Sequence, residues 1–343
     1  MMRIGVLGAG AIGGYLGVRL SAGGAAVSLV GRRSLVELRS RLCAVALDGG
    51  RQRPGDDLVV TEDPAALRDA EVVLVTVKST ATAEAAALID AQARAEAVVV
   101  SFQNGLGNAR ILRDTLGASR VVAGMVAFNV VREDEGARLR QATRGPLVAG
   151  TGEGAVDAVM RSLGEAFTAG GLALELRRDI EGVLAGKLLL NLNNGICAAT
   201  GLPIASSLRS RDARWCLSRC MLEGLAAVHA AGQRPVSVLG LPPWLIARAL
   251  LLPDAILLRV AKRLVSADPQ ARSSTLQDLD AGKPTEIDAL NGAIVALGRE
   301  HGVRCPANET VVEVVRGLEA ASPPLPFVTP ARLRERIMVR TGA

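Results

Sequence analysis

Residues 3–13, RIGVLGAGAIG, predict the architecture of the first part of the chain. The segment begins with a short apolar run typical of a buried strand, and a run compatible with a helix follows it. The pattern G-x-G-x-x-G is weak alone, but between a strand and a helix it indicates a dinucleotide-binding loop. Its glycines permit a tight turn, close approach of a pyrophosphate to the backbone, and close packing of helix on sheet. The phosphates are expected at the helix N-terminus. The expected loop consists of Gly8, Ala9, Gly10, Ala11, Ile12 and Gly13.

The end of the second predicted strand indicates which dinucleotide is bound. An acidic residue there favours NAD, because it accepts a hydrogen bond from the ribose 2′-hydroxyl. This chain instead has Gly31-Arg32-Arg33 after the strand at 26–30. Guanidinium groups suit a 2′-phosphate, which prefers bidentate cationic partners. The pair therefore favours NADP, and two solvent-facing loop arginines remain the alternative.

Two further strands are followed by polar residues. Lys78 comes directly after the strand at 72–77, and Gln103-Asn104-Gly105 follows the strand at 98–101. In a parallel sheet both positions lie at the ligand-binding edge. Lys78 is expected to reach a cofactor phosphate or ribose, and Asn104 to hold cofactor or substrate. Asn-Gly is also an ordinary turn signal, so a binding role and a purely structural turn both stay open for Asn104.

Alternating strands and helices predict a parallel α/β sheet with right-handed crossovers up to about residue 177. A long β-rich run at 121–131 is followed by charged turn residues at 132–138 and a return strand at 142–149. The other elements expected in this part are a strand at 59–60, helices at 34–42, 80–94 and 106–116, and a βαβ-like piece at 154–176.

Strand signals disappear after about residue 178. The sequence therefore predicts an α/β domain over 1–177 with a Rossmann-like NADP-binding sheet, and an all-α substrate and catalytic domain over 178–343. The helical stretches lie at 179–200, 211–232, 242–264, 271–281, 286–301 and 308–320, with a last helix that carries Arg332, Arg334, Arg336 and Arg340 on its solvated face.

Composition excludes several classes of protein. Hydrophobic residues make up 49% and charged residues 22% of 343 residues, which excludes a disordered chain. The net charge of +6 mildly favours anionic ligands, but the basic residues are scattered and aromatic residues are few, so nucleic acid is not expected. The apolar stretch 239–265 contains charges and prolines, so no membrane span is expected. For the apolar stretch 236–264 a place in the core is favoured, with a hinge or a dimer surface as the alternatives.

Five cysteines form no CxxC motif. Cys216 and Cys220 lie one helical turn apart, without histidine or cysteine partners at metal-ligand spacing. Free buried thiols in a reducing cytoplasm are the expected interpretation, so the protein is predicted to be cytoplasmic and to hold no metal. The oligomeric state does not follow from the sequence, and a homodimer stays open.

Lys187, Asn191 and Asn194 are spaced i, i+4 and i+7 in an otherwise apolar helix. They share one face, and three polar groups on such a face need partners or a wet cleft. A lysine that snorkels to solvent is the alternative. Lysine occurs only four times in the chain, whereas 36 residues are arginine, a poor proton donor.

A second polar cluster spans Ser273 to Asp278 and continues at Pro284 to Asp288. Thr285 is expected to cap a helix that begins at Glu286, with Asp288 as the carboxylate of a capping box. Reduction of a ketone by hydride needs a donor that protonates the oxygen. Because both histidines lie outside these clusters, Lys187 is the best candidate acid.

The sequence resembles the ketopantoate reductase (2-dehydropantoate 2-reductase) family over nearly the whole chain. The resemblance rests on the glycine loop, on Val77-Lys78-Ser79 and Gln103-Asn104-Gly105, and on Gly186 to Asn191. The most specific motifs are Ser273-Ser274-Thr275-Leu276-Gln277-Asp278 and Thr285-Glu286-Ile287-Asp288-Ala289-Leu290-Asn291-Gly292. The family fold is a Rossmann-like NADPH domain followed by a helical domain like that of 6-phosphogluconate dehydrogenase.

The resemblance implies a role for each residue that matches a motif. Lys187 is the proton donor and Asn191 helps to hold the keto oxygen. Ser274 anchors the substrate carboxylate, and Glu286 supports the polar network. The implied cofactor contacts come from Lys78, Asn104 and, at the 2′-phosphate, Arg32. The implied reaction is NADPH-dependent reduction of 2-dehydropantoate to (R)-pantoate, on the route to pantothenate and coenzyme A.

The chain departs from the family pattern at one position. Some members carry a second asparagine eight residues after the lysine, near the substrate hydroxyl, where this chain has Gly195 preceded by Asn194. A shift by one residue turns a helical side chain by about 100°. Asn194 is kept as a candidate substrate-binding residue. Two rivals remain: a reductase of another branched 2-keto acid, and a non-catalytic NADP(H)-binding sensor.

Overall fold

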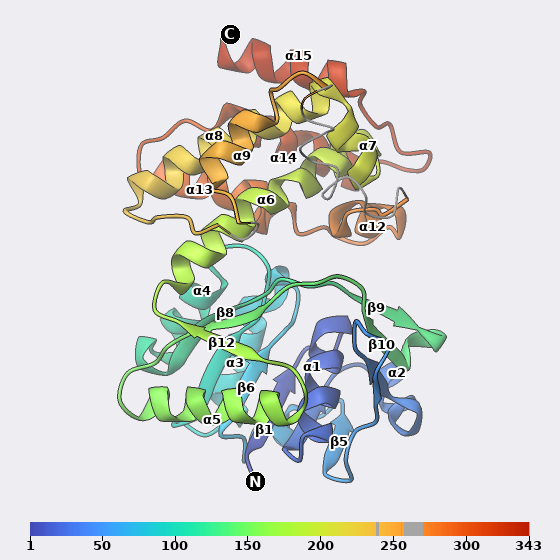
Figure 1. The fold of residues 1–343 in the computed structure, drawn as a ribbon, viewed down its shortest axis with the longest axis vertical. Coiled ribbons are helices and arrows are strands. Elements are labelled where there is room, and N and C mark those ends of the chain that lie inside the picture. Colours follow the sequence, from blue (N-terminus) through green and yellow to red (C-terminus); the bar gives the residue numbers. More distant parts are fainter. Residues whose placement is uncertain (238–239, 255, 257–269, 343) are drawn as a thin grey trace. The chain divides into compact units, whose positions relative to one another are not determined.

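The computed structural model describes residues 1–237, 240–254, 256 and 270–342 (Figure 1). The chain forms two compact units, Met1–Ile180 and Glu181–Ala343. The domain boundary expected after residue 177 lies at the end of the last strand, three residues before the end of the first unit. The roles assigned to the two domains stay predictions.

The first unit is built on an eight-stranded sheet with the order β12-β11-β8-β7-β6-β1-β2-β5. Neighbouring strands are parallel except for β11, which runs antiparallel to β8. The expected parallel α/β sheet is therefore confirmed, as is the return strand that pairs with the run at 121–131. The strands are β1 (Arg3–Leu7), β2 (Ala26–Val30), β5 (Leu58–Thr61), β6 (Val72–Val75), β7 (Val98–Ser101), β8 (Val121–Val126), β11 (Leu147–Gly150) and β12 (Leu174–Arg177).

Helices connect these strands in two directions away from β1. The crossover β1–α1–β2 leads one way and β6–α3–β7–α4–β8 leads the other, so right-handed connections put the two sets of helices on opposite faces. Accordingly, α1 packs beside α5, and α3 packs beside α4. The helices are α1 (Ala11–Ala22), α3 (Thr82–Gln92), α4 (Asn108–Leu116) and α5 (Ala155–Ala169), with short turns η2 (Pro64–Leu67), η3 (Ser79–Ala81) and η4 (Ala118–Arg120).

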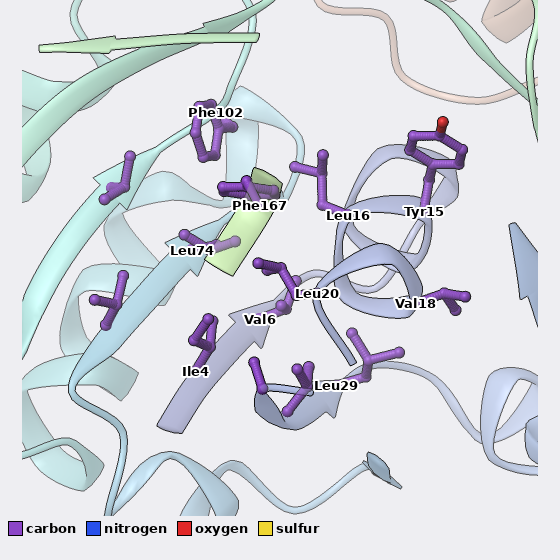
Figure 2. Packing of buried hydrophobic residues seen from close by; sticks show 14 of the residues in the cluster. Ile4, Val6, Tyr15, Leu16, Val18, Leu20, Leu29, Leu74, Phe102 and Phe167 are labelled. Atoms are coloured by element: carbon purple, nitrogen blue, oxygen red, sulfur yellow. The ribbon is translucent and has the colours of Figure 1, made fainter. Parts of the chain in front are cut away.

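The core of the first unit lies between the sheet and α1 (Figure 2). Ile4 and Val6 of β1 alternate with residues of the opposite face, and Leu16 and Leu20 of α1 cover them. A Cβ at Gly17 would lie 2.2 Å from Leu29, so this glycine lets the helix approach β2 closely. The glycines of α1 thus serve packing as well as the loop.

A second, four-stranded sheet with the order β4-β3-β10-β9 was not predicted. The expected turn at 132–138 is present but shorter, because the hairpin strands β9 (Val130–Glu133) and β10 (Arg138–Gln141) occupy its two ends. The turn, η5 (Asp134–Gly136), has positive φ at all three residues and therefore reverses the chain tightly. The remaining strands are β3 (Cys43–Val45) and β4 (Arg51–Gln52).

The helix expected at 34–42 is also wrong in extent. It consists of α2 (Arg33–Val36) and the short turn η1 (Arg39–Arg41). Only Leu35 of this segment before Leu42 is buried, so too little apolar surface is available to hold a regular helix on the sheet.

The second unit is helical over the described residues. Its two long helices are α6 (Ile180–Thr200) and α8 (Arg211–Ala230). Shorter helices surround them, and α8 packs against α9, α13 and α15. The shorter helices are α7 (Ile204–Arg209), α9 (Pro243–Ala249), α12 (Ser274–Asp280), α13 (Asn291–Glu300), α14 (Pro306–Glu319) and α15 (Pro330–Thr341). The overall class, α/β followed by all-α, is as expected.

The helix predicted from residue 286 begins later than expected. A short turn η6 (Ile287–Ala289) comes first, and Leu290 has ψ −98°, which separates it from α13. The predicted capping box does not form, because Asp288 accepts a hydrogen bond from Arg316 (2.7 Å). The Thr285 hydroxyl instead accepts from the N–H of Ile287 at 3.2 Å.

The helix predicted at 242–264 ends at Ala249 in the structure, and its residues 255 and 257–264 lie outside the described part of the chain. The expected place in the core is wrong for much of the described stretch, because Leu241, Trp244, Leu251 and Ile256 are between 43% and 50% exposed. Among the described helices, none is long and apolar enough to cross a membrane.

Candidate active site

The predicted cofactor residues gather at one edge of the large sheet. Strands β1, β2, β6 and β7 are neighbours and parallel, so the loops that follow them lie together at their carboxyl ends. These loops carry Gly8–Gly13, Arg32, Lys78 and Asn104. The edge includes the point between β1 and β6 where the winding of the sheet reverses, the usual place for a dinucleotide.

Each glycine of the loop has a different surrounding. Gly8 has φ +97°, and a Cβ there would clash with the backbone of Val77 at 2.5 Å. A Cβ at Gly13 would lie 2.2 Å from the hydroxyl of Thr76. At Gly10, by contrast, the nearest atom would be 3.9 Å away, so a group from outside has room to approach the backbone.

The start of α1 favours an anion. No side chain caps the helix, and no acidic residue lies in its first turn. Its first N–H groups therefore offer donors and a positive dipole end to a phosphate. The hydroxyl of Thr76 donates to the carbonyl of Gly8 at 2.8 Å and holds the loop. Thr76 was not predicted, because its role depends on the carbonyl of Gly8, which is distant in the sequence. These residues fit the pyrophosphate of a dinucleotide.

Arg32 and Arg33 differ in availability. Arg33 forms an ion pair with Glu37 at 3.4 Å. Arg32 is exposed and forms no ion pair with any residue that the structure describes. A Cβ at Gly31 would lie 2.9 Å from the Cβ of Ala9, so the end of β2 lies against the glycine loop. Arg32 is therefore the arginine of the pair that has its charge available beside the loop.

Hydrogen bonds join the loop of Lys78 to that of Asn104. The hydroxyl of Ser79 donates to the carbonyl of Asn104 at 2.9 Å, and the side chain of Asn108 donates to the same carbonyl at 2.7 Å. The buried amide of Gln103 donates to the hydroxyl of Thr82 at 2.7 Å. Lys78 and Asn104 are exposed on these hydrogen-bonded loops. Asn108 and Thr82 were not predicted; both lie at the first turn of a helix after a sheet strand.

In the helical unit, Glu286 lies near enough to Lys187 to interact with it electrostatically. Lys187 lies on α6 and is partly buried among apolar neighbours. Burial lowers the pKa of Lys187 to about 8, and the carboxylate of Glu286 opposes that shift. A lysine with such a pKa exchanges its proton near neutral pH while a nearby negative charge favours the ammonium form. The pair therefore has the properties of an acid in proton transfer.

The other predicted substrate residues extend the same region of α6. The side chain of Asn194 donates to the hydroxyl of Ser274 at 3.5 Å, and Ser273 donates to the carbonyl of Asn194 at 3.3 Å. These bonds attach α12 to α6. Asn191 lies one turn after Lys187, and its side chain forms no hydrogen bond with the described residues. All five predicted residues of this unit lie on these few connected elements.

Gly195 faces a different direction from the lysine. A Cβ at this position would lie 2.3 Å from Oδ1 of Asn291 and 2.8 Å from Val311. The position is thus packed against α13 and α14. The buried Asn291 was quoted in a motif but not predicted as a site residue, and its burial gave no signal in the sequence.

None of the cysteines was predicted as a site residue. Four of the five are buried and none forms a disulfide, as expected. Burial raises the pKa of the Cys216 and Cys305 thiols to about 12, so neither is a ready nucleophile. Across the described residues, no group of histidine, cysteine and acidic side chains is arranged to hold a metal ion.

Comparison with known proteins identifies the family. A family model described as ketopantoate reductase PanE/ApbA matches residues 4–154, and the model of the C-terminal part of that family matches residues 179–319. The chain belongs to the ketopantoate reductase family. The first match lies within the sheet unit, and the second covers most of the helical unit.

Individual members of the ketopantoate reductase family are similar over nearly their whole length. A 2-dehydropantoate 2-reductase of Halobacterium salinarum is 32% identical and is matched over 92% of this chain and 98% of its own. The crystal structure of a PanE/ApbA family ketopantoate reductase from Ralstonia eutropha is 31% identical, with a TM-score of 0.78 over 93% of this chain and 98% of its own. A D-mandelate dehydrogenase described with NADH and anilino(oxo)acetate shares the fold at 19% identity, with a TM-score of 0.75 over 93% and 98%.

Proposed function

We propose that this protein reduces 2-dehydropantoate to (R)-pantoate with NADPH. Membership in the ketopantoate reductase family makes it an oxidoreductase that acts on a CH–OH group, and a small 2-keto acid is the substrate class. The observation that carries the proposal is the pairing of the partly buried Lys187 with Glu286, because it supplies the acid that a ketone reduction needs.

NADPH, when bound, supplies the hydride. Residues of the sheet unit would hold it: the glycine loop and the start of α1 the pyrophosphate, and Arg32 the 2′-phosphate. Lys78 would contact a phosphate or the ribose of the cofactor, and Asn104 would contact the nicotinamide side. The same fold occurs in a protein described with NADH, so the choice between the two cofactors rests on Arg32 rather than on the fold.

Lys187 would complete the reaction by moving one proton. When hydride adds to the keto carbon, the electron pair of the carbonyl moves to oxygen, and the ammonium of Lys187 donates a proton there. The alcohol and NADP are the products, and the neutral amine regains a proton from solvent. Glu286 favours the charged form of the lysine before transfer, so that the acid is ready at neutral pH.

The remaining polar residues would orient the substrate. Asn191 is assigned to the keto oxygen and Ser274 to the carboxylate. Asn194, bonded to Ser274, is assigned to the polar end of the substrate. Neutral donors of this kind hold an anion without adding a competing acid. The polar groups of 2-dehydropantoate match these three residues. Its carboxylate matches Ser274, its ketone matches Asn191, and its terminal hydroxyl matches Asn194.

The absorbance of NADPH provides the test. Purified protein is mixed with NADPH and 2-dehydropantoate, beside a panel of other 2-keto acids and a parallel series with NADH. Oxidation that is fastest with 2-dehydropantoate and NADPH supports the proposal. Oxidation only with another keto acid contradicts the assignment of 2-dehydropantoate as the substrate. Faster oxidation of NADH contradicts the assignment of NADPH as the cofactor.

A second candidate is reduction of a different branched 2-keto acid. It is favoured by the position of Gly195, whose missing side chain lies toward Asn291 and Val311. If Asn194 does not reach the terminal hydroxyl, a keto acid without that hydroxyl is reduced equally well. The expected cytoplasmic location and the homodimer remain predictions.

A further inference from the structure

Buried amides form a chain of defined polarity inside the helical unit. Glu223 of α8 accepts hydrogen bonds from the backbone N–H of Ala307 and Asn308 at 2.8 and 3.0 Å. The side-chain amide of Asn308 donates to Glu223 at 2.8 Å and to the carbonyl of Cys220 at 3.1 Å. Because a carboxylate and a carbonyl only accept, these bonds fix the orientation of the Asn308 amide.

The orientation of Asn308 determines that of Asn291. Oδ1 of Asn308 accepts, so the NH2 group of Asn291 points toward it, at 3.1 Å. Oδ1 of Asn291 therefore points the other way, toward Gly195 of α6. That oxygen is buried and has no hydrogen-bond partner among the described residues. A buried acceptor without a partner is costly, so the surroundings must hold it there.

Gly195 makes this contact sterically possible. A Cβ at position 195 would lie 2.3 Å from Oδ1 of Asn291, a distance that real side chains do not show. Glycine presents a Cα hydrogen in that direction, a weak donor to oxygen. The contact thus sets how closely the start of α13 approaches α6, the helix that carries Lys187.

The segment that carries Glu286 is attached to α14 at three points. We call residues 285–291 the strap. The N–H of Thr285 donates to Glu319 at 2.8 Å, Arg316 donates to Asp288 at 2.7 Å, and Asn291 donates to Asn308 at 3.1 Å. Residue numbers rise along the strap as they fall along α14, so strap and helix run antiparallel. Glu286 lies between the first two attachments.

We propose that Asn291 is a positioning residue: held by Asn308 and Glu223, it seats the strap on α14 and meets α6 at Gly195, and so sets the place of Lys187 relative to Glu286. Lys187 precedes Gly195 by two helical turns, about 12 Å along a rigid helix, so a displacement at one is passed to the other. This positioning role concerns Lys187, the proposed acid, and it therefore rests on the proposed function.

The first test uses the small number of lysines. With only four lysines in the chain, NMR of isotope-labelled lysine side chains follows each amine separately, and the Lys187→Ala variant assigns the signal of Lys187. Gly195→Ala pushes α6 away from the strap and from Glu286. The titration midpoint of Lys187 is expected to fall by roughly half a unit or more, since the charge that favours the ammonium is weakened. Independently, kcat is expected to fall by about tenfold or more with a smaller change in KM.

A matched control separates positioning from folding. Gly317 is an exposed glycine of α14 where a Cβ would meet no atom within 4 Å, so Gly317→Ala should leave the Lys187 midpoint and kcat unchanged. A Gly195→Ala protein that is folded, binds NADPH and keeps both the midpoint and kcat of the parent overturns the proposal.

A second pair of variants changes Glu319, whose side chain is exposed. Glu319→Ala removes the acceptor of the Thr285 N–H, whereas Glu319→Gln keeps an acceptor oxygen. The proposal predicts that only the alanine variant lowers the Lys187 midpoint and kcat. Equal behaviour of the two variants contradicts it. The titration of Lys187 does not depend on turnover. A parent protein that fails to reduce 2-dehydropantoate overturns the proposed function, whereas the titration midpoints of the variants still test the positioning role of Asn291.

Discussion

The burial of Lys187 has a cost to stability. Its pKa of about 8, against an ordinary 10.5, means that the folded protein binds the proton less tightly than the unfolded chain does. The difference is present as a destabilisation below pH 8 and is relieved as the pH rises from about 8 to 10.5. The buried ammonium therefore destabilises the fold, as a group kept for a function at the expense of stability would.

Removal of the amine tests the acid directly. Lys187→Ala is expected to lower kcat by roughly 10²- to 10⁴-fold, the usual contribution of a general acid, while NADPH binding is retained. In the parent protein, kcat is expected to fall as the pH rises through about 8, because the ammonium loses its proton. Steady-state kinetics from pH 6 to 10 measures both effects.

Lys283 supplies the control for that experiment, because it is exposed in the same unit. Lys283→Ala should keep the parent kcat and pH profile. Turnover that survives in Lys187→Ala contradicts the assignment of the acid. Retained NADPH binding in a protein that never turns over any keto acid, parent included, favours the sensor over the enzyme.

Arg32 carries the prediction about cofactor choice. Arg32→Ala should weaken NADPH binding by roughly 1–3 kcal/mol, the value of a hydrogen bond to a charged group, and leave NADH binding nearly unchanged. Fluorescence titration with each cofactor measures the two affinities. Arg33→Ala is the neighbouring control, since Arg33 already pairs with Glu37. Equal losses for NADPH and NADH in Arg32→Ala contradict contact with the 2′-phosphate.

The start of α14 shows how a helix end determines stability. Glu223 receives three hydrogen bonds there, two from backbone N–H groups and one from Asn308. Burial raises the pKa of the Glu223 carboxyl, and the hydrogen bonds from Ala307 and Asn308 oppose that shift. The carboxylate satisfies donors that the first turn of any helix leaves without intrahelical partners.

Glu223→Ala is expected to lower the free energy of unfolding at pH 7 by about 2–4 kcal/mol, because the cap is lost and buried donors remain unpaired. Denaturation in urea measures the change. Glu313→Ala on the same helix removes an exposed carboxylate that pairs with Arg340 at 2.6 Å, and should cost no more than about 1 kcal/mol. Similar losses of unfolding free energy in both variants would show that the buried cap contributes no more than an exposed ion pair.

The elements differ in how far sequence predicts them. The central strands of the large sheet were predictable because β6, β7 and β8 are nearly continuous apolar runs, buried at every position. The strands of the small sheet have two to four residues and partly exposed side chains, so composition does not distinguish them from turns. The start of α13 was misplaced because bonds from Thr285 to Glu319 and from Arg316 to Asp288 replace the local cap. Such long-range partners leave no periodic pattern.

The candidate site follows the same rule. The glycine loop and the polar face of α6 were predictable from local spacing alone. Thr76 and Asn291 were not, because their importance depends on which backbone or side chain they meet across the fold. Gly195 shows the limit most clearly: its identity is visible in the sequence, but the oxygen of Asn291 that it accommodates is not.

The division into two units makes a prediction about the whole protein. All residues assigned to the cofactor belong to Met1–Ile180, whereas Lys187 and its partners belong to Glu181–Ala343. A ligand that binds only the folded state stabilises it by about 2.7 kcal/mol at a concentration one hundred times its Kd. NADPH should therefore raise the thermal transition of the sheet unit, and calorimetry with and without NADPH measures the increase. Lys187→Ala should keep the increase, and Arg32→Ala should reduce it. If Lys187→Ala abolishes the increase while Arg32→Ala preserves it, the assignment of cofactor binding to the sheet unit is wrong.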